Sequence, residues 1–185
     1  MSSIKRNLHV AVVGPPGSGK TTYINRATKG EYVNTRSTTT PIVNVYTNSE
    51  LFENGLVRIH LHETPNENFP PLGGWDAAMI FAELRLDEKG NKCVRPFSSE
   101  SDLMREMVPP TRTVLVLSKA DVWNPRYNPD TTDTEQAFAH IHPLACVTSS
   151  LAWVQVDRPL SLIVRMFDSQ AAIVNSPPIQ PPTVG

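Results

Sequence analysis

The residues best suited to chemistry stand near the amino terminus, in the run Gly14, Pro15, Pro16, Gly17, Ser18, Gly19, Lys20 and Thr21. This run matches the phosphate-binding pattern G-x-x-x-x-G-K-[ST], whose backbone N–H groups and helix start surround a phosphate. The pattern predicts that Lys20 reaches the β- and γ-phosphates and that the Thr21 hydroxyl ligates Mg²⁺. We expect the phosphate site to extend to Thr22. The alternative is a glycine-rich turn that binds nothing.

The segments on either side of this loop have the character that the motif requires. Residues 8–13 are mostly apolar and β-rich, which is typical of a buried central strand. Residues 21–27 can begin a helix, which ends near residues 28–31. A strand, a glycine-rich turn and a helix start together make an anion site, because the positive end of the helix faces the ligand.

The rest of the chain alternates between predicted strands and helices. Strands are expected at residues 42–47, 56–62, 76–86, 113–117 and 144–147, the first two forming a hairpin, although the start of 76–86 also suits a helix. Helices are expected at residues 98–107, 134–140 and 159–168, with Pro159 as the first helical residue. Residues 87–97 are polar and contain a turn at residues 88–91. The order predicts an α/β P-loop fold: a mostly parallel six-stranded sheet, helices on both faces, and ligands at the carboxyl ends of the strands.

A second candidate piece of the site follows the strand at residues 113–117. Ser118, Lys119 and Asp121 resemble the Asn-Lys-x-Asp guanine-reading motif of GTPases. An aspartate there accepts two hydrogen bonds from guanine, and adenine cannot supply that pair of donors. The stem of Lys119 could cover the base, whereas Ser118 in place of Asn removes an amide able to bond the base and tie the loop together. The alternative is a solvated surface loop.

Thr39 is a third candidate, because it lies 39 − 21 = 18 positions after Thr21 in a polar loop. This is the Ras-type separation of the two hydroxyls that ligate magnesium. In such proteins the second threonine closes over the γ-phosphate, so that its loop orders in one nucleotide state. Thr38 and Thr40 leave the register open by one residue, and a flexible loop without a ligand is the alternative.

Taken together, these patches resemble the Ras superfamily of small GTPases, and within it the Ran family. The resemblance runs through residues 19–26, 29–32, 45–48, 67–72 and 159–162, and it places Thr148, Ser149 and Ser150 where a guanine-contacting loop belongs. It implies a GTPase domain over residues 1–170 and a proline-rich tail over 171–185. It further implies GDP or GTP with Mg²⁺ as ligands, protein effectors or regulators as partners, and a monomer.

The departures from the family cluster after the strand at residues 56–62. Ras-like proteins carry Asp-x-x-Gly-Gln there, and the aligned residues include Glu63, Asn66 and Glu67. By the resemblance Glu63 stands at the metal, Asn66 offers its N–H to the γ-phosphate, and Glu67 replaces the catalytic glutamine, with Lys20 as the other catalytic residue. A carboxylate accepts hydrogen bonds but cannot donate one to the transition state, so we expect slow or impaired GTP hydrolysis.

Composition limits the remaining possibilities. The chain has 185 residues and a net charge of −1, so no nucleic-acid or membrane partner is expected. Its two cysteines make no disulfide framework and suit a cytoplasmic or nuclear protein. Two other readings stay open: a pseudo-GTPase scaffold held in one state, and an ATP-dependent phosphotransferase, which the Pro-Pro-Gly-Ser filling of the loop favours. His60 and His62 alternate on one strand face, without the spacing of a zinc site.

Overall fold

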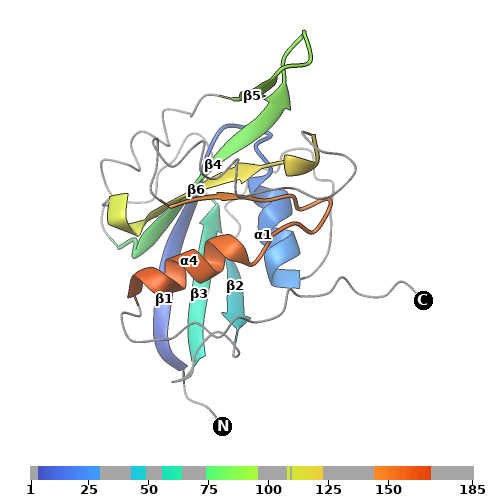
Figure 1. The fold of residues 1–185 in the computed structure, drawn as a ribbon. Coiled ribbons are helices and arrows are strands. Elements are labelled where there is room, and N and C mark those ends of the chain that lie inside the picture. Colours follow the sequence, from blue (N-terminus) through green and yellow to red (C-terminus); the bar gives the residue numbers. More distant parts are fainter. Residues whose placement is uncertain are drawn as a thin grey trace, which may run out of the picture.

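A mostly parallel sheet forms the centre of the protein (Figure 1). The computed structural model describes residues 4–29, 43–48, 56–63, 74–95, 108, 110–122 and 144–167. Six strands lie in the order β2-β3-β1-β4-β6-β7, and all neighbours are parallel except β2 and β3. Their bounds are β1 (Ile4–Val13), β2 (Val43–Asn48), β3 (Leu56–Glu63), β4 (Ala77–Leu86), β6 (Thr113–Ser118) and β7 (Ala145–Val147). The predicted α/β class, the strands and the antiparallel hairpin are confirmed.

The central strands consist of continuous apolar runs because both of their faces are covered. Residues 10–13 of β1, the first eight residues of β4 and all six residues of β6 are buried. Such runs are typical of parallel strands in the interior of an α/β sheet. The start of residues 76–86 is therefore strand and not helix.

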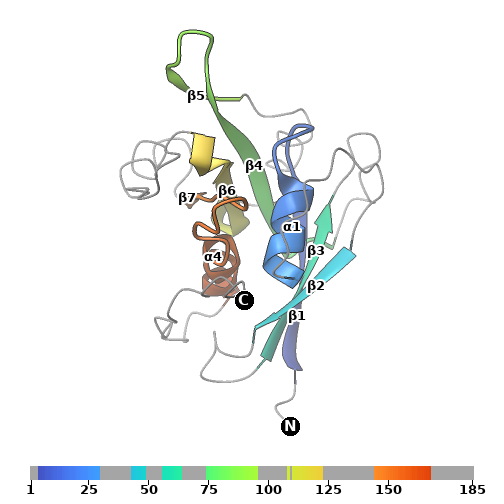
Figure 2. The same cartoon turned by 90° about the vertical axis from the view of Figure 1, so that its right-hand side faces the viewer.

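Both described α-helices pack on the same face of the sheet (Figures 1 and 2). They are α1 (Lys20–Lys29), which follows β1, and α4 (Arg158–Phe167) near the end of the chain. The Tyr23 hydroxyl donates a hydrogen bond of 2.9 Å to the Val156 carbonyl and so joins α1 to the segment before α4. α4 begins at Arg158, one residue earlier than predicted, so Pro159 is its second residue. The missing N–H of Pro159 removes no helical hydrogen bond there, because N–H groups in the first turn have no partner within the helix.

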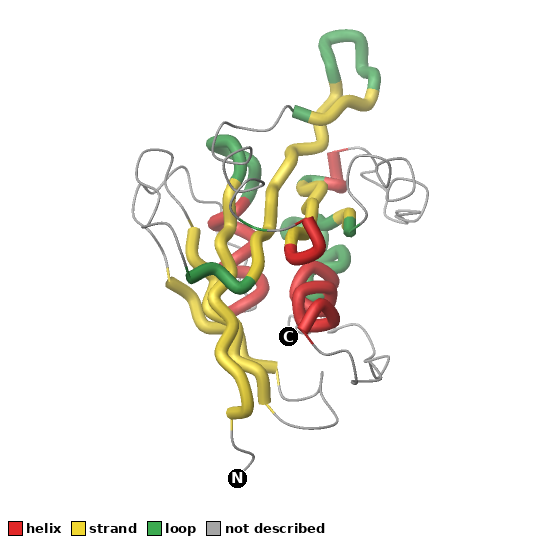
Figure 3. Tube along the Cα trace, turned by 90° about the vertical axis from the view of Figure 1, so that its left-hand side faces the viewer, coloured by secondary structure: helices red, strands yellow, loops and turns green. Residues whose placement is uncertain are grey.

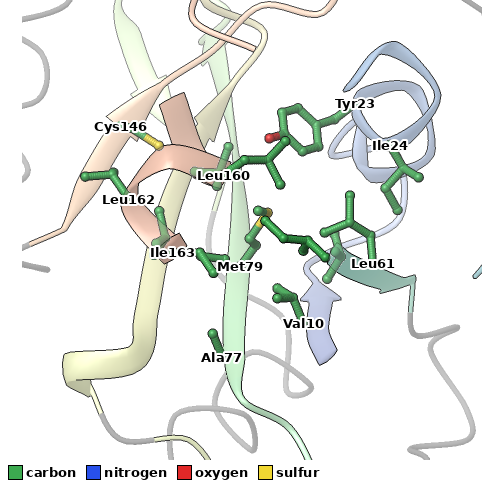
Figure 4. Close-up of a cluster of buried hydrophobic side chains, with 14 of the residues drawn as sticks. Val10, Tyr23, Ile24, Leu61, Ala77, Met79, Cys146, Leu160, Leu162 and Ile163 are labelled. Atoms are coloured by element: carbon green, nitrogen blue, oxygen red, sulfur yellow. The ribbon is translucent and has the colours of Figure 1, made fainter. Parts of the chain in front are cut away.

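The core between the two helices and the sheet is shown in Figure 4. Leu160 and Ile163 from α4 and Ile24 from α1 are fully buried there, together with Met79 of β4. Burial of such side chains contributes about 1.5–3 kcal/mol each, which fixes α1 against the strand that precedes it. The amino end of α1 is thereby held at the carboxyl edge of the sheet.

The opposite face has its own apolar layer. It consists of Ala11, Val13, Ala78, Ile80, Ala82, Leu84, Val108, Leu115, Leu117, Ala120 and Val147. Apart from two short 3₁₀ turns, η1 (Pro110–Arg112) and η2 (Ala120–Val122), the described ranges contain no helix besides α1 and α4. Helices on both faces therefore stay a prediction, because residues 98–107 and 134–140 lie outside those ranges.

A projecting hairpin contains the turn predicted at residues 88–91, and its second strand was not predicted. β4 continues past the sheet to Leu86, and the chain returns as β5 (Lys92–Val94), antiparallel to β4 (Figure 3). The Asp87 carboxylate accepts the N–H groups of Lys89 and Asn91 at 2.9 and 2.7 Å and so closes the turn. After β5 the Arg95 N–H donates to the Glu83 carbonyl at 2.9 Å, which returns the chain to the edge of the main sheet.

Candidate functional site

The glycine-rich loop joins β1 to α1 at the carboxyl edge of the sheet. Because β1 has β3 on one side and β4 on the other, the loop leaves the sheet where the chain order reverses, the usual place for a ligand in an open α/β sheet. Gly14 has a φ of 148°, and a Cβ there would come within 2.6 Å of the Phe81 carbonyl oxygen of β4. The loop can follow this path only because residue 14 is glycine.

Lys20 folds back over the loop that precedes it. Its ammonium donates hydrogen bonds to the carbonyls of Gly14 at 2.8 Å and Pro15 at 3.1 Å, and the residue is only 6% exposed. The Ser18 N–H donates to the same Pro15 carbonyl at 3.1 Å. A buried positive charge therefore lies at the first residue of α1, where the helix end is itself electropositive.

Thr21 and Glu63 are hydrogen-bonded to each other beside this charge. The Thr21 hydroxyl lies 2.7 and 2.8 Å from the two carboxylate oxygens of Glu63, the last residue of β3. Burial raises the pKa of Glu63, and the Thr21 hydrogen bond and the Lys20 charge offset part of that rise. A hydroxyl and a carboxylate are ligands that suit Mg²⁺, whose other ligands in phosphate sites are water and phosphate oxygens.

Ser118 corrects an expectation drawn from the sequence. It stands where the guanine-reading motif that the sequence resembles has asparagine, and we expected the loss of that amide to remove a tie from the loop. Instead its hydroxyl donates a hydrogen bond of 2.6 Å to the Ser18 carbonyl, and the Ala82 carbonyl lies 3.2 Å away. Ser118 and Ser18 are both buried. A hydroxyl of the right reach therefore connects the end of β6 to the phosphate loop.

Asp121 lies in η2, and its carboxylate is oriented by the loop after β7. The Ser149 hydroxyl donates to Asp121 Oδ1, while the Ala152 N–H donates to that hydroxyl at 3.0 Å. Backbone bonds join the same two loops, from Ala120 N–H to the Thr148 carbonyl at 3.1 Å. Thr148 and Ser149 are buried, and Ser150 is half-buried. Among the described residues, Asp121 makes no hydrogen bond through its other carboxylate oxygen, Oδ2.

Glu83 is a part of this edge that sequence reasoning missed. Its buried carboxylate accepts from the Lys119 ammonium and from Arg85 Nε at 2.9 Å, and Arg95 Nη1 lies 3.5 Å from it. Burial alone would raise the pKa of Glu83, but the hydrogen bonds and charges of Lys119 and Arg85 outweigh burial and lower it. The signal was present in the sequence: Glu83 and Arg85 alternate at the end of an otherwise apolar strand.

Three histidines form a separate cluster on the sheet face opposite α1. His60 and His62 share one face of β3, as predicted, and His9 of β1 joins them. The His9 ring stacks on His60 at 4.7 Å, its Nδ1 lies 3.1 Å from His62 Nε2, and His62 meets the Trp75 ring edge to face at 5.0 Å. Burial, followed by the neighbouring charges, lowers the pKa of both His60 and His62.

Several predicted site residues cannot be placed. Thr39, Asn66 and Glu67 lie outside the described residues, whereas Gly14 to Thr22, Glu63, Ser118, Lys119, Asp121 and residues 148–150 lie at the carboxyl edge of the sheet. Among the residues that the structure describes, no group of three or more His, Cys, Asp or Glu side chains could hold a metal ion.

Comparison of the sequence with protein-family models and with curated proteins found no match. Within the described part of the chain, no helix is long and apolar enough to cross a membrane.

Proposed function

We propose that this protein is a divergent, Ran-like small GTPase. It binds GDP or GTP with Mg²⁺ and acts as a nucleotide-dependent switch or partner-binding module. The observation that carries the proposal is the placement of two loops at one sheet edge: the phosphate loop before α1 and the Asp121 loop held by Ser149. A mostly parallel sheet with a glycine-rich loop at its switch point suits a Ras-like P-loop fold.

Each end of the site has a distinct task in this proposal. At the loop, Lys20 exchanges its carbonyl partners for phosphate oxygens, and the N–H groups at the start of α1 point toward the same charge. Thr21 and Glu63 would hold Mg²⁺, which supplies positive charge to the phosphates when it is bound. At the other end, the Asp121 carboxylate accepts the two adjacent donors of guanine.

Hydrolysis is expected to be slow. Glu67 replaces the glutamine that orients water in the family, and Glu63 is longer by one methylene than the family aspartate. Single-turnover hydrolysis with purified protein should give a rate at or below the order of 10⁻⁴ s⁻¹, the intrinsic rate of Ras. A rate well above that level without a partner would contradict this part of the proposal.

Base selection is the sharpest test of the proposed function. Labelled GTP bound to the protein is displaced with GDP or with ATP, in the presence of Mg²⁺. We expect GDP to compete far better than ATP in the wild-type protein. Asp121→Asn keeps an oxygen for the Ser149 hydroxyl but replaces a guanine acceptor with a donor, so it should abolish the preference for GDP. Equal competition by ATP would favour the phosphotransferase reading instead.

A further inference from the structure

Arg95 reaches the phosphate loop from a distant part of the chain. Its Nη1 donates a hydrogen bond of 2.9 Å to the carbonyl of Pro16, the third residue of the loop. The hairpin of β4 and β5 returns Arg95 to this point, because the Arg95 N–H pairs with the Glu83 carbonyl. A residue 79 positions along the chain therefore contacts the loop that the sequence motif identifies.

Arg95 and Lys20 bind consecutive carbonyls of the same loop. Lys20 donates to the carbonyls of Gly14 and Pro15, and Arg95 donates to the next one, at Pro16. Lys20 is the residue expected to meet the β- and γ-phosphates. The Arg95 guanidinium therefore lies next to the part of the loop that Lys20 contacts, where the terminal phosphates are expected.

The charge around Arg95 leaves it free to act on an anion. Glu83 is one negative charge shared by Lys119, Arg85 and Arg95, so the cluster has a surplus of positive charge. The Arg95 side chain is 34% exposed, and among the described residues its contacts with Glu83 and with the Pro16 carbonyl both use Nη1. A guanidinium carries five N–H donors in a planar fork that matches phosphate oxygens, so Nε and Nη2 have donors to offer.

We propose that Arg95 contacts the terminal phosphate of a bound nucleoside triphosphate, and so lets the protein distinguish the triphosphate from the diphosphate. This inference rests on the proposed function. It assigns to the β5 hairpin a task that the sequence did not indicate. Because Glu83 holds both Arg95 and Lys119, the same carboxylate positions one cation at the loop and another beside Asp121.

The test is a calorimetric titration of wild-type protein, Arg95→Ala and Arg85→Ala with GDP and with a non-hydrolysable GTP analogue, each with Mg²⁺. Arg95→Ala should weaken binding of the analogue by about tenfold or more and change GDP binding by less than about twofold, as expected for loss of a charge-assisted hydrogen bond. Arg85 is the matched control, since it is an arginine that pairs with the same Glu83 carboxylate. Arg85→Ala should leave the ratio of the two affinities unchanged.

The outcomes separate the two proposals. An Arg95→Ala protein that binds both nucleotides less tightly by the same factor shows that Arg95 is a structural tether, and this result overturns the inference alone. A wild-type protein that binds neither nucleotide overturns the proposed function, and the inference with it. Arg95→Lys checks the geometry: a point charge without the planar fork should recover only part of the preference for the triphosphate.

Discussion

The Ser118 hydroxyl and the Ser18 carbonyl are joined by a hydrogen bond of 2.6 Å, although the two residues are 100 positions apart in the chain. This bond ties the middle of the phosphate loop to the end of β6, the strand that leads directly into Lys119 and Asp121. The Ser118 side chain therefore joins the two ends of the candidate nucleotide site, the glycine-rich loop and the loop that contains Asp121.

Removing that bond should destabilise the protein more than removing a neighbouring hydroxyl. Ser118→Ala leaves the Ser18 carbonyl without its donor in a buried place, and we expect a loss of about 1–2 kcal/mol in the free energy of unfolding. Ser18→Ala is the matched control, because the Ser18 hydroxyl is buried and has no partner among the described residues. It should be nearly neutral. Urea unfolding measures both, and equal losses would show that the Ser118 bond contributes nothing particular.

The loop glycines should differ sharply in their tolerance of a side chain. Gly14→Ala would press a Cβ to within 2.6 Å of the Phe81 carbonyl and 2.9 Å of Phe81 Cβ, in the interior of the sheet. We expect a loss of about 3 kcal/mol or more from overpacking and backbone strain. A Cβ at residue 17 would meet nothing within 4 Å. Because Gly17 has a φ of 78°, Gly17→Ala should cost only roughly 1 kcal/mol of backbone strain. Thermal unfolding of the two variants should rank them in this order.

Glu63 should make stability depend on pH in a direction opposite to that of most carboxylates. Its pKa is raised by burial above the ordinary value of 4.5, so the folded state holds the proton more tightly than the unfolded state. The contribution of Glu63 to the free energy of unfolding is fully present below pH 4.5. It is lost as the pH rises through the pKa that Glu63 has in the folded state. Glu63→Gln should therefore gain stability relative to wild type at pH 7 but not at pH 4. Denaturant unfolding at both pH values measures this, and an equal difference at the two would refute it.

The histidine cluster should destabilise the protein on acidification. Burial and the neighbouring histidines hold the pKa of His62 below the ordinary value of 6.5, so the unfolded state binds its proton first. The contribution of His62 to stability is present above pH 6.5 and is lost as the pH falls through the pKa that His62 has in the folded state. His62→Gln should show a smaller loss of melting temperature between pH 7.5 and pH 5.5, as measured by calorimetry, than wild type. An equal loss of melting temperature in the two proteins would show that residues other than His62 cause the acid sensitivity.

The fold could be predicted from the sequence because its central strands are mostly apolar runs and its loop is a strong local signal. Residues 113–118 form a short run rich in Val and Leu, which favours a buried strand over a helix, and the glycines of residues 14–19 mark the turn to α1. The hairpin of β4 and β5 could not be predicted in this way. Residues 92–94 are too few to show a period, and their pairing depends on a turn closed by the Asp87 side chain.

In the site too, residues of one local motif could be predicted, whereas contacts between distant parts of the sequence could not. Lys20 and Thr21 belong to one contiguous motif, so their positions followed from the spacing. The links from Ser118 to Ser18 and from Arg95 to Pro16 join residues 100 and 79 positions apart. Such contacts depend on which strands become neighbours, and the motifs do not encode that. The role of Glu83 was missed for the same reason, because two of its three partners, Arg95 after β5 and Lys119 after β6, are distant in the sequence.

The most direct measurement is a calorimetric titration of wild-type protein and Lys20→Ala with GTP in the presence of Mg²⁺. We expect one site per chain in the wild-type protein. In the variant we expect a loss of affinity of about a hundredfold or more, because a buried ammonium that would contact the phosphates is removed. Absence of binding to the wild-type protein, or equal binding by both, would contradict the claim that the loop of residues 14–21 holds a nucleotide.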